Sequence, residues 1–161
     1  MQRRVFLTAL IGSAAFAGVS YGKINMQSNP KFDINYDEKT WRSKLTPEEF
    51  RVLRKEGTES PGSSPLNAEK GKGVYKCAGC GLTLFTSEMK YDSGTGWPSF
   101  YDAIPGRVET KTDFKMILPR TEYHCARCGG HQGHVFKDGP APTGLRYCNN
   151  GVALDFVKQS N

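Results

Sequence analysis

VYKCAGCGLTLF at residues 74–85 places two cysteines in a glycine-rich turn between two short β-prone segments. The same arrangement returns in EYHCARCGGHQGHVF at residues 122–136. Two residues separate the cysteines of each pair, so both sulfurs can reach one side of the turn, and the glycine that follows permits a positive φ. Two such turns supply the four thiolates of a tetrahedral Zn²⁺ site. The expected ligands are Cys77, Cys80, Cys125 and Cys128.

Two other interpretations of these cysteine pairs stay open, namely two disulfide bonds or a redox-active CxxC motif. A redox CxxC normally lies at a helix N-terminus, where the helix dipole lowers the thiol pKa. No helical pattern follows either pair. Disulfides form readily in exported proteins. We favour one zinc ion over both of these interpretations. The zinc site should be structural, because four protein ligands leave no open position for a substrate.

Short β-prone segments separated by Gly and Pro turns continue around the two cysteine pairs. This pattern predicts a mainly β protein with antiparallel strands in a sandwich or barrel-like arrangement. The expected strands cover residues 74–76, 82–85, 108–110, 114–118, 122–124, 134–136, 145–148 and 152–157.

One helix is expected ahead of this region, at LTPEEF (residues 45–50). Thr46 is the predicted N-cap, and Glu49 completes a capping box with it. We expect the helix to run to about Lys55, with Gly57 at its end.

The first 22 residues, MQRRVFLTALIGSAAFAGVSYG, have the parts of an export signal. Arg3 and Arg4 precede an uncharged run that is shorter than the roughly 20 residues of a membrane-spanning helix. Ala15-Phe16-Ala17 is a cleavage candidate. The stretch at residues 3–7 resembles the twin-arginine signal of bacteria, which predicts export to the periplasm. The alternatives are an ordinary Sec signal or an uncleaved anchor.

One folded domain is expected after this signal. The chain has 161 residues, of which 37% are hydrophobic and 11% are aromatic. This composition supports one core and excludes a multi-pass membrane protein. Residues 23–35 are polar and irregular and are expected to be a linker, so the domain covers residues 36–161. We expect a monomer that contacts a membrane only through an uncleaved signal.

A fifth cysteine, Cys148, has no partner once the other four bind zinc. An odd cysteine in an exported protein is either incidental or a reactive thiol. Arg146 lies two residues away, so on a strand it shares a face with Cys148, where a guanidinium favours the thiolate. Asn150 would offer an amide donor on the same face if the strand continues.

Two histidines and one aromatic loop add to the candidate site. His131 and His134 follow the second cysteine pair, and Asp138 lies in a turn that could orient an imidazole. A thiol, imidazoles and a carboxylate are the groups of acid–base and nucleophilic catalysis. Trp97, in GTGWPSF at residues 94–100, packs either in the core or on the wall of a pocket.

In combination, these motifs resemble the B-type methionine-R-sulfoxide reductases over about residues 41–157. The motifs are Gly57-Thr58-Glu59, the two cysteine pairs, Gly96-Trp97-Pro98-Ser99-Phe100, His131-x-x-His134-Val135-Phe136-x-Asp138-Gly139-Pro140 and Arg146-Tyr147-Cys148-x-Asn150. The resemblance implies a mainly β fold with two antiparallel sheets in a barrel-like or β-tent arrangement. It also implies short N-terminal helices and a structural zinc knuckle pair away from the active site.

The resemblance implies a role for each matching residue. Cys148 would attack the sulfur of methionine-R-sulfoxide and become a sulfenic acid. His131 and His134 would hold and protonate the sulfoxide oxygen, while Asn150 would orient the reacting groups. The supporting and substrate-binding residues would be Asp138, Arg146, Trp97 and Phe136.

One position departs from many members of that family, because Thr95 stands where they carry a resolving cysteine. We therefore expect one catalytic cysteine, whose sulfenic acid is reduced directly by an external, thioredoxin-like thiol. Gln132 also differs, since leucine is common there. The expected substrates are oxidised proteins and peptides that carry methionine-R-sulfoxide.

Two functions of other classes stay as alternatives. A four-cysteine zinc module for nucleic acid would gather basic and aromatic residues on the knuckles, but only Lys76 and Arg127 lie there. We therefore expect no nucleic-acid partner. A non-catalytic, zinc-stabilised interaction domain of the same fold would not need Cys148, His131 and His134 together.

Overall fold

The computed structural model describes residues 31–115 and 118–160. The predicted signal at residues 1–22 and most of the predicted linker lie outside the described residues. Residues 31–35 are described and pack against the second cysteine turn. There the Ile34 N–H donates to the carbonyl of Arg127 at 3.0 Å, and the Phe32 ring meets the edge of His124. No helix of the described residues is long and apolar enough to cross a bilayer.

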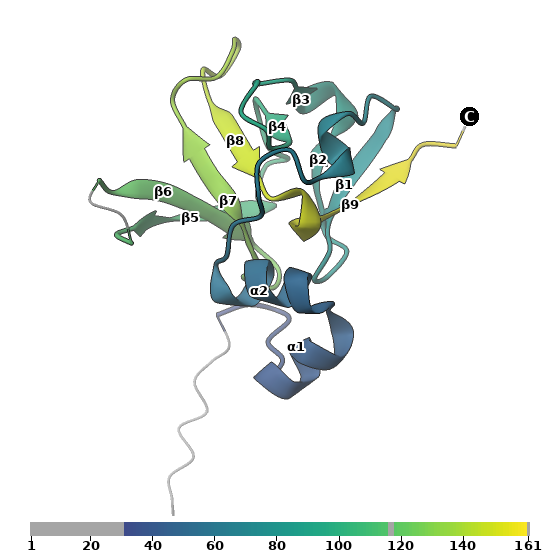
Figure 1. Ribbon diagram of the computed structural model, residues 1–161, viewed down its shortest axis with the longest axis vertical. Coiled ribbons are helices and arrows are strands. Elements are labelled where there is room, and N and C mark those ends of the chain that lie inside the picture. The colour runs from purple at the N-terminus through teal and green to yellow at the C-terminus, as the bar shows by residue number, and fades with distance from the viewer. Residues whose placement is uncertain (1–30, 116–117, 161) are drawn as a thin grey trace, which may run out of the picture.

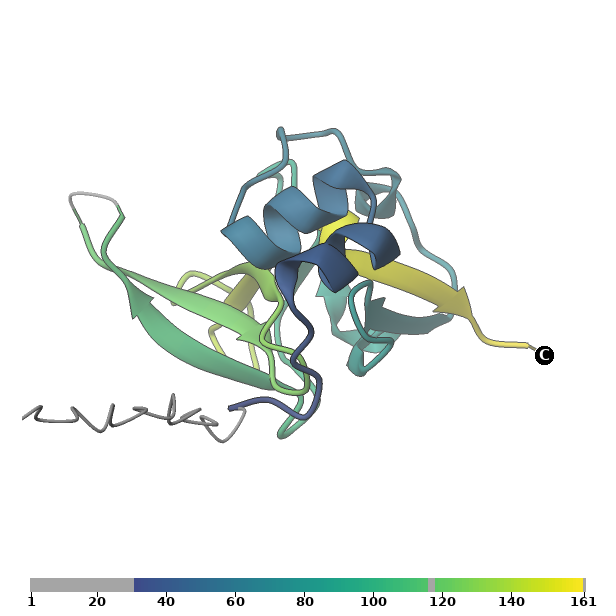
Figure 2. The same cartoon turned by 90° about the horizontal axis from the view of Figure 1, so that it is seen from below.

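Two helices precede the sheets, α1 (Glu38–Lys44) and α2 (Pro47–Lys55). Seen from below, they lie in front of the region where the two sheets meet (Figure 2). The predicted capping box is confirmed, because Thr46 Oγ1 accepts from the Glu49 N–H at 3.3 Å and Glu49 Oε2 accepts from the Thr46 N–H at 2.7 Å.

The end of α2 differs from the expectation by one residue. Glu56, and not Gly57, takes the left-handed conformation, with φ of 53°. Its carboxylate forms ion pairs with Lys111 and Lys115. These two lysines hold the pKa of Glu56 at about 2. We infer that the charged pairing offsets the backbone cost of a left-handed residue that is not glycine.

The strands form two antiparallel sheets, as expected (Figure 1). The three-stranded sheet has the order β2-β1-β9 and consists of β1 (Gly73–Cys77), β2 (Thr83–Thr86) and β9 (Leu154–Lys158). The six-stranded sheet has the order β3-β4-β8-β7-β6-β5 and consists of β3 (Lys90–Tyr91), β4 (Ser99–Phe100), β5 (Val108–Asp113), β6 (Arg120–Cys125), β7 (His131–Phe136) and β8 (Arg146–Asn149). Three short 3₁₀ turns complete the described elements, namely η1 (Pro65–Asn67), η2 (Ser87–Met89) and η3 (Gly151–Ala153).

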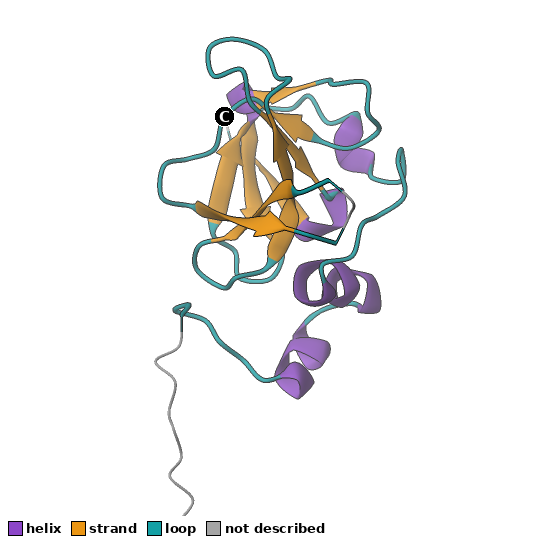
Figure 3. Ribbon diagram, turned by 90° about the vertical axis from the view of Figure 1, so that its left-hand side faces the viewer, coloured by secondary structure: helices purple, strands orange, loops and turns teal. Residues whose placement is uncertain are grey.

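Neither sheet closes on itself, so the barrel-like arrangement is limited to two open sheets that face each other. Figure 3 shows the strands of both sheets gathered in one body, with the α-helices below them. Aromatic rings fill the space between the sheets. Phe85 of β2 stacks on Phe100 of β4 with ring centroids 4.1 Å apart, and Tyr75 of β1 meets the edge of the same ring. Such buried rings carry much of the apolar area that stabilises a small domain.

The expected strand at residues 114–118 is wrong in its described part, residues 114, 115 and 118, which are in no strand; residues 116–117 lie outside the described residues. β5 runs on to Asp113, which pairs with Arg120 at the start of β6, and the residues between them form the connection. Phe114 and Leu118 are 75% and 76% exposed, so their apolar character does not reflect a buried strand.

The capping box gives a stability test. Thr46→Ala should lower the free energy of unfolding by about 1 kcal/mol, because the Glu49 N–H loses its side-chain acceptor. Urea denaturation followed by circular dichroism measures the change. Lys39→Ala, at an exposed position of α1, is the control and should stay within about 0.5 kcal/mol of the parent. Equal stability of the two variants would show that the box contributes nothing.

Candidate active site and metal centre

The four cysteines of the two pairs come together at one end of both sheets. Their sulfurs all lie within 4.8 Å of one another, with Cys77 and Cys128 Sγ 3.8 Å apart and Cys80 and Cys125 Sγ 3.5 Å apart. A tetrahedral Zn²⁺ with bonds of about 2.3 Å needs sulfurs about 3.8 Å apart, so the cluster fits the ion. All five cysteines of the chain are free thiols in the structure. These separations are also longer than the roughly 2.05 Å of a disulfide bond.

The local backbone explains why both turns present their sulfurs inward. Gly81 and Gly129, which follow the two pairs, have φ of 71° and 66°, as the sequence predicts. Cys77 ends β1 and Cys125 ends β6, so one ion at this cluster would join the three-stranded sheet to the six-stranded sheet. Such an ion would be structural, since its four ligands leave no position for a substrate.

Cys148 lies away from this cluster, at a separate cavity of about 130 Å³. The cavity is lined by Thr58, Trp97, Arg120, Gly133, His134, Phe136, Cys148, Asn149 and Asn150. Five of the predicted site residues are therefore brought together here. Cys148 of β8 stands directly opposite His134 of β7 in the antiparallel ladder, which puts the thiol and the imidazole on the same face.

A glycine allows β7 and β8 to come this close. A Cβ atom at Gly133 would lie 1.9 Å from the backbone oxygen of Cys148, which no side chain can tolerate. A glycine at position 133 is therefore required for β7 and β8 to approach each other at the cavity. Nothing else in the sequence indicates this close approach.

Two opposing effects act on the pKa of the Cys148 thiol. Burial raises it, and the side chains of Arg146 and Thr95 lower it by favouring the thiolate, but burial is the larger effect. The sequence-based expectation that Arg146 favours the thiolate is correct in direction. Because burial outweighs it, the pKa of Cys148 still lies above its ordinary value.

Asp138 does not orient an imidazole, contrary to the expectation. Its carboxylate forms two bonds with the Arg146 guanidinium, at 2.9 Å to Nε and 2.7 Å to a terminal nitrogen. Arg146 in turn lies over the Phe136 ring, 4.4 Å from its centroid. The turn after β7 places Asp138 beside β8. Asp138 therefore holds Arg146 in position, and Arg146 in turn packs on the Phe136 ring that forms the apolar wall.

Two carboxylates that no sequence motif indicates lie beside the histidines. Asp113 Oδ2 lies 2.8 Å from His134 Nε2, and Glu122 Oε1 lies 3.0 Å from His131 Nδ1. Burial lowers the pKa of His134, and the hydrogen bond with Asp113 acts in the opposite direction. Asp113 on β5 and Glu122 on β6 reach the histidines of β7 only because of the register of these three strands. No local sequence motif therefore indicates these two acids.

His131 differs from His134 in its surroundings. It is 2% exposed and lies behind the cavity, with its ring centroid 5.5 Å from that of His134. Although Glu122 is close, neither ring nitrogen of His131 has a well-aligned hydrogen bond within the described residues. Buried polar groups normally have partners, so this imidazole keeps a donor or acceptor free.

The Asn150 side-chain amide makes two hydrogen bonds inside the protein. Its Oδ1 accepts from the Glu59 N–H at 2.9 Å, and its Nδ2 donates to the Gln132 carbonyl at 2.9 Å. Trp97 is tied to the same segment, because its indole N–H donates to the Glu59 carbonyl at 3.2 Å. Asn150 therefore fixes the segment after β8 next to Trp97, and the second N–H of its Nδ2 is not used by these bonds at the cavity that Asn150 lines.

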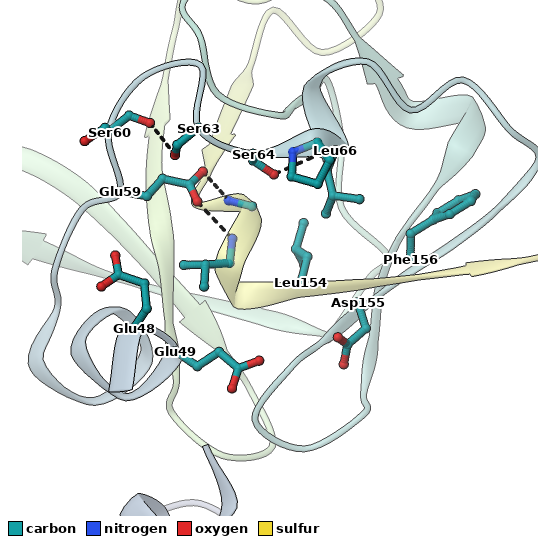
Figure 4. Close-up of a pocket in the computed structure, with 13 residues that line it drawn as sticks. Glu48, Glu49, Glu59, Ser60, Ser63, Ser64, Leu66, Leu154, Asp155 and Phe156 are labelled. Carbon is teal, nitrogen blue, oxygen red and sulfur yellow. Dashed lines mark hydrogen bonds between the residues drawn. The ribbon is translucent and has the colours of Figure 1, made fainter. Parts of the chain in front are cut away.

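A larger hollow of about 630 Å³ lies beside η3 (Figure 4). It holds neither a cysteine nor a histidine among its lining residues. Its buried acid, Glu59, accepts from the backbone N–H groups of Gly151 and Val152 at 2.6 and 3.0 Å, as the dashed lines show. Through these two hydrogen bonds, Glu59 holds in place the segment that follows Cys148.

The comparisons with known proteins show the family of this chain. Residues 45–158 match the SelR domain family. The chain belongs to the family of B-type methionine-R-sulfoxide reductases. Two relatives named "Peptide methionine sulfoxide reductase MsrB" are the proteins of Methanosarcina mazei, which is 53% identical over 80% of this chain and 92% of its own length, and of Leptospira interrogans, which is 48% identical over 80% and 98%. The matched region of this reductase family member contains both the four-cysteine cluster and the Cys148 cavity.

The two kinds of cysteine can be separated by substitution. Cys77→Ser should release the metal and lower the free energy of unfolding by several kcal/mol, because structural zinc contributes directly to folding. Cys148→Ser, the matched control, should keep the metal and the stability of the parent. Elemental analysis and urea denaturation give both quantities. Retention of a full metal complement by Cys77→Ser would refute the proposed ligand set.

The Asp113 contact gives a titration test. Asp113→Asn should lower the pKa of His134 further, because burial then acts without the carboxylate that favours the imidazolium. The change is followed by NMR titration of the imidazole proton signals. Glu109→Gln, on the same strand but exposed, should leave the His134 titration unchanged. An unaltered pKa in Asp113→Asn would mean that the pair has no electrostatic effect.

Proposed function

We propose that the protein reduces methionine-R-sulfoxide in oxidised peptides and proteins, with Cys148 as its one catalytic cysteine. The observation that carries the proposal is the pairing of Cys148 with His134 across β7 and β8, at a cavity with Trp97 and Phe136 on its wall. A sulfoxide oxygen leaves only after protonation, so a sulfur nucleophile and an acid must face each other.

The first step converts the substrate to methionine and oxidises the enzyme. The Cys148 thiolate attacks the sulfoxide sulfur while an imidazolium delivers one proton to the sulfoxide oxygen. This attack forms a bond between Cys148 Sγ and the substrate sulfur. The protonated oxygen then moves to Cys148 Sγ while the sulfur–oxygen bond of the substrate and the new sulfur–sulfur bond both break, which leaves Cys148 as a sulfenic acid. Methionine leaves with the electron pair that the cysteine sulfur has given up. His134 lines the cavity and is the proton donor, whereas the buried His131 supports the oxygen through its free ring nitrogen.

The second step restores the thiol with external reductant. Thr95 occupies the position of a resolving cysteine in the family, and the four other cysteines form the metal cluster. A thioredoxin-like dithiol therefore attacks the sulfenic acid directly and releases water. Its second thiol then breaks the mixed disulfide, which returns Cys148 and leaves the reductant oxidised.

Selectivity for one epimer follows from the opposed walls of the cavity. The two epimers of methionine sulfoxide exchange the positions of oxygen, methyl group and lone pair around sulfur. A site with an indole on one side for the methyl group and an imidazole on another for the oxygen accepts one arrangement only. This agrees with the existence of a separate enzyme for each epimer.

We also propose that the domain covers residues 36–161 and acts as a monomer in the periplasm, delivered by a twin-arginine signal at residues 1–22. The paired Arg3 and Arg4 ahead of an uncharged run support this location. Export of an already folded chain allows zinc to bind before the cysteines meet an oxidant. Detection of the full-length chain in the cytosol alone would overturn the location without affecting the chemistry.

The reaction is tested with peptides that carry either the R- or the S-sulfoxide, in the presence of a dithiol. The R-peptide should be reduced and the S-peptide left unchanged, as measured by chromatography of the products. Cys148→Ser should abolish reduction while keeping metal and fold. His134→Gln should lower kcat by about 100-fold or more with a smaller effect on KM, because proton delivery acts in the transition state. Equal reduction of both epimers would contradict the assigned site.

A further inference from the structure

The cavity at Cys148 has a cationic residue on its wall, Arg120 at the start of β6, to which no role has been given so far. Arg120 and Glu122 are two residues apart on β6, so their side chains lie on one face of the sheet. Glu122 stands opposite His134, and His134 stands opposite Cys148. The guanidinium therefore lies on the same face as the thiol and the imidazole.

One carboxylate holds both Arg120 and His134. Asp113 Oδ2 lies 2.8 Å from Nη2 of Arg120 and 2.8 Å from Nε2 of His134. Its other oxygen, Oδ1, accepts from the Lys115 N–H at 2.9 Å. The Lys115 N–H and the His134 ring hold the pKa of Asp113 well below its usual range, so the carboxylate is ionised and only accepts hydrogen bonds. Nη2 and Nε2 therefore each direct a hydrogen at Asp113.

Arg120 keeps one buried donor that Asp113 does not use. Its Nε is buried and has no hydrogen-bond partner among residues 31–115 and 118–160. On His134 the nitrogen that remains is Nδ1, because Nε2 is bound to Asp113. Buried N–H groups normally have partners, and a guanidinium nitrogen can only donate. A free Nε–H on a residue that lines a cavity therefore indicates an acceptor that belongs to a ligand.

The oxygen of a sulfoxide is the acceptor that fits these two donors. It carries partial negative charge and has lone pairs for more than one hydrogen bond. The cavity of about 130 Å³ is smaller than the pockets of about 300 Å³ or more that hold whole ligands. It therefore takes the methionine sulfoxide side chain alone, with its methyl group against Trp97 and Phe136 and its oxygen toward the polar part of the wall.

We propose that Arg120 is a catalytic residue whose Nε–H donates to the sulfoxide oxygen, beside the Nδ1–H of the His134 imidazolium. The guanidinium draws electron density from the sulfur–oxygen bond, which makes the substrate sulfur more open to attack by the Cys148 thiolate. Arg120 keeps all of its hydrogens, and the one proton that is transferred comes from His134. This role rests on the proposed function, because it adds a contact to the same substrate.

The experiment measures how much the sulfoxide oxygen contributes to binding, without any turnover. Zinc-loaded Cys148→Ser is titrated by calorimetry with an R-sulfoxide peptide and with the same peptide containing unoxidised methionine. The ratio of the two Kd values reports the oxygen, because the rest of the peptide is identical. The sulfoxide peptide should bind more tightly. Addition of Arg120→Met to Cys148→Ser should reduce the ratio by about tenfold and leave the Kd of the methionine peptide unchanged.

The sign of this change separates a direct contact from an effect through His134. The positive charge of Arg120 is one cause that lowers the pKa of His134, after burial and against the Asp113 hydrogen bond. Its removal would favour the imidazolium and so strengthen binding of the oxygen. A weaker preference for the sulfoxide therefore reports the lost Nε–H. Arg120→Lys keeps a positive charge beside Asp113 but has no Nε–H, and it should also lower the ratio.

Arg107→Met, at an exposed position ahead of β5, is the matched control and should keep the ratio of Cys148→Ser. Zinc content shows that each variant is folded. An unchanged ratio in Arg120→Met overturns the proposal. Equal weakening of both peptides also overturns it, because Arg120 would then bind the peptide main chain. No preference for the sulfoxide in Cys148→Ser itself would overturn the proposed function, whereas a preference that survives Arg120→Met counts against Arg120 alone.

Discussion

The meeting of four cysteine sulfurs within 4.8 Å is the constraint on which the rest of the structure depends. It joins the end of β1 to the end of β6, and hence one sheet to the other. It also reaches the cavity through Gln132, which is fully buried and lies between the two. The Gln132 side chain donates to Cys77 Sγ at 3.3 Å and accepts from the Asn149 amide at 3.4 Å, next to Cys148. A metal ion at this cluster would thus support the strand that carries Cys148 without touching the Cys148 sulfur.

Around Cys148, the protein balances burial against a few directed polar contacts. Burial keeps water from the sulfur but disfavours the thiolate, and Arg146 and Thr95 partly offset that effect. The same balance applies to His134, where burial disfavours the imidazolium and Asp113 favours it. Burial is the larger effect at both groups, so the surroundings disfavour the charged form of each.

The sequence predicts those parts of the structure that depend on near neighbours. The capping box at Thr46 and the turns after both cysteine pairs are local, so their residues suffice to predict them. Asp113 and Glu122 could not be predicted, because they reach the histidines only through the register of three strands. The suggestion that Asp138 could orient an imidazole fails for the same reason, since the turn after β7 directs its carboxylate to Arg146 on β8.

The central claim is that one sulfur performs the chemistry while four others hold a metal. Its most direct test is to alkylate the native, zinc-loaded protein with a limiting amount of reagent until Cys148 alone is modified, and then to measure sulfoxide reduction and bound zinc together. The account predicts that reduction stops and that one zinc ion per chain stays bound. Reduction that continues after complete modification of Cys148 would contradict it.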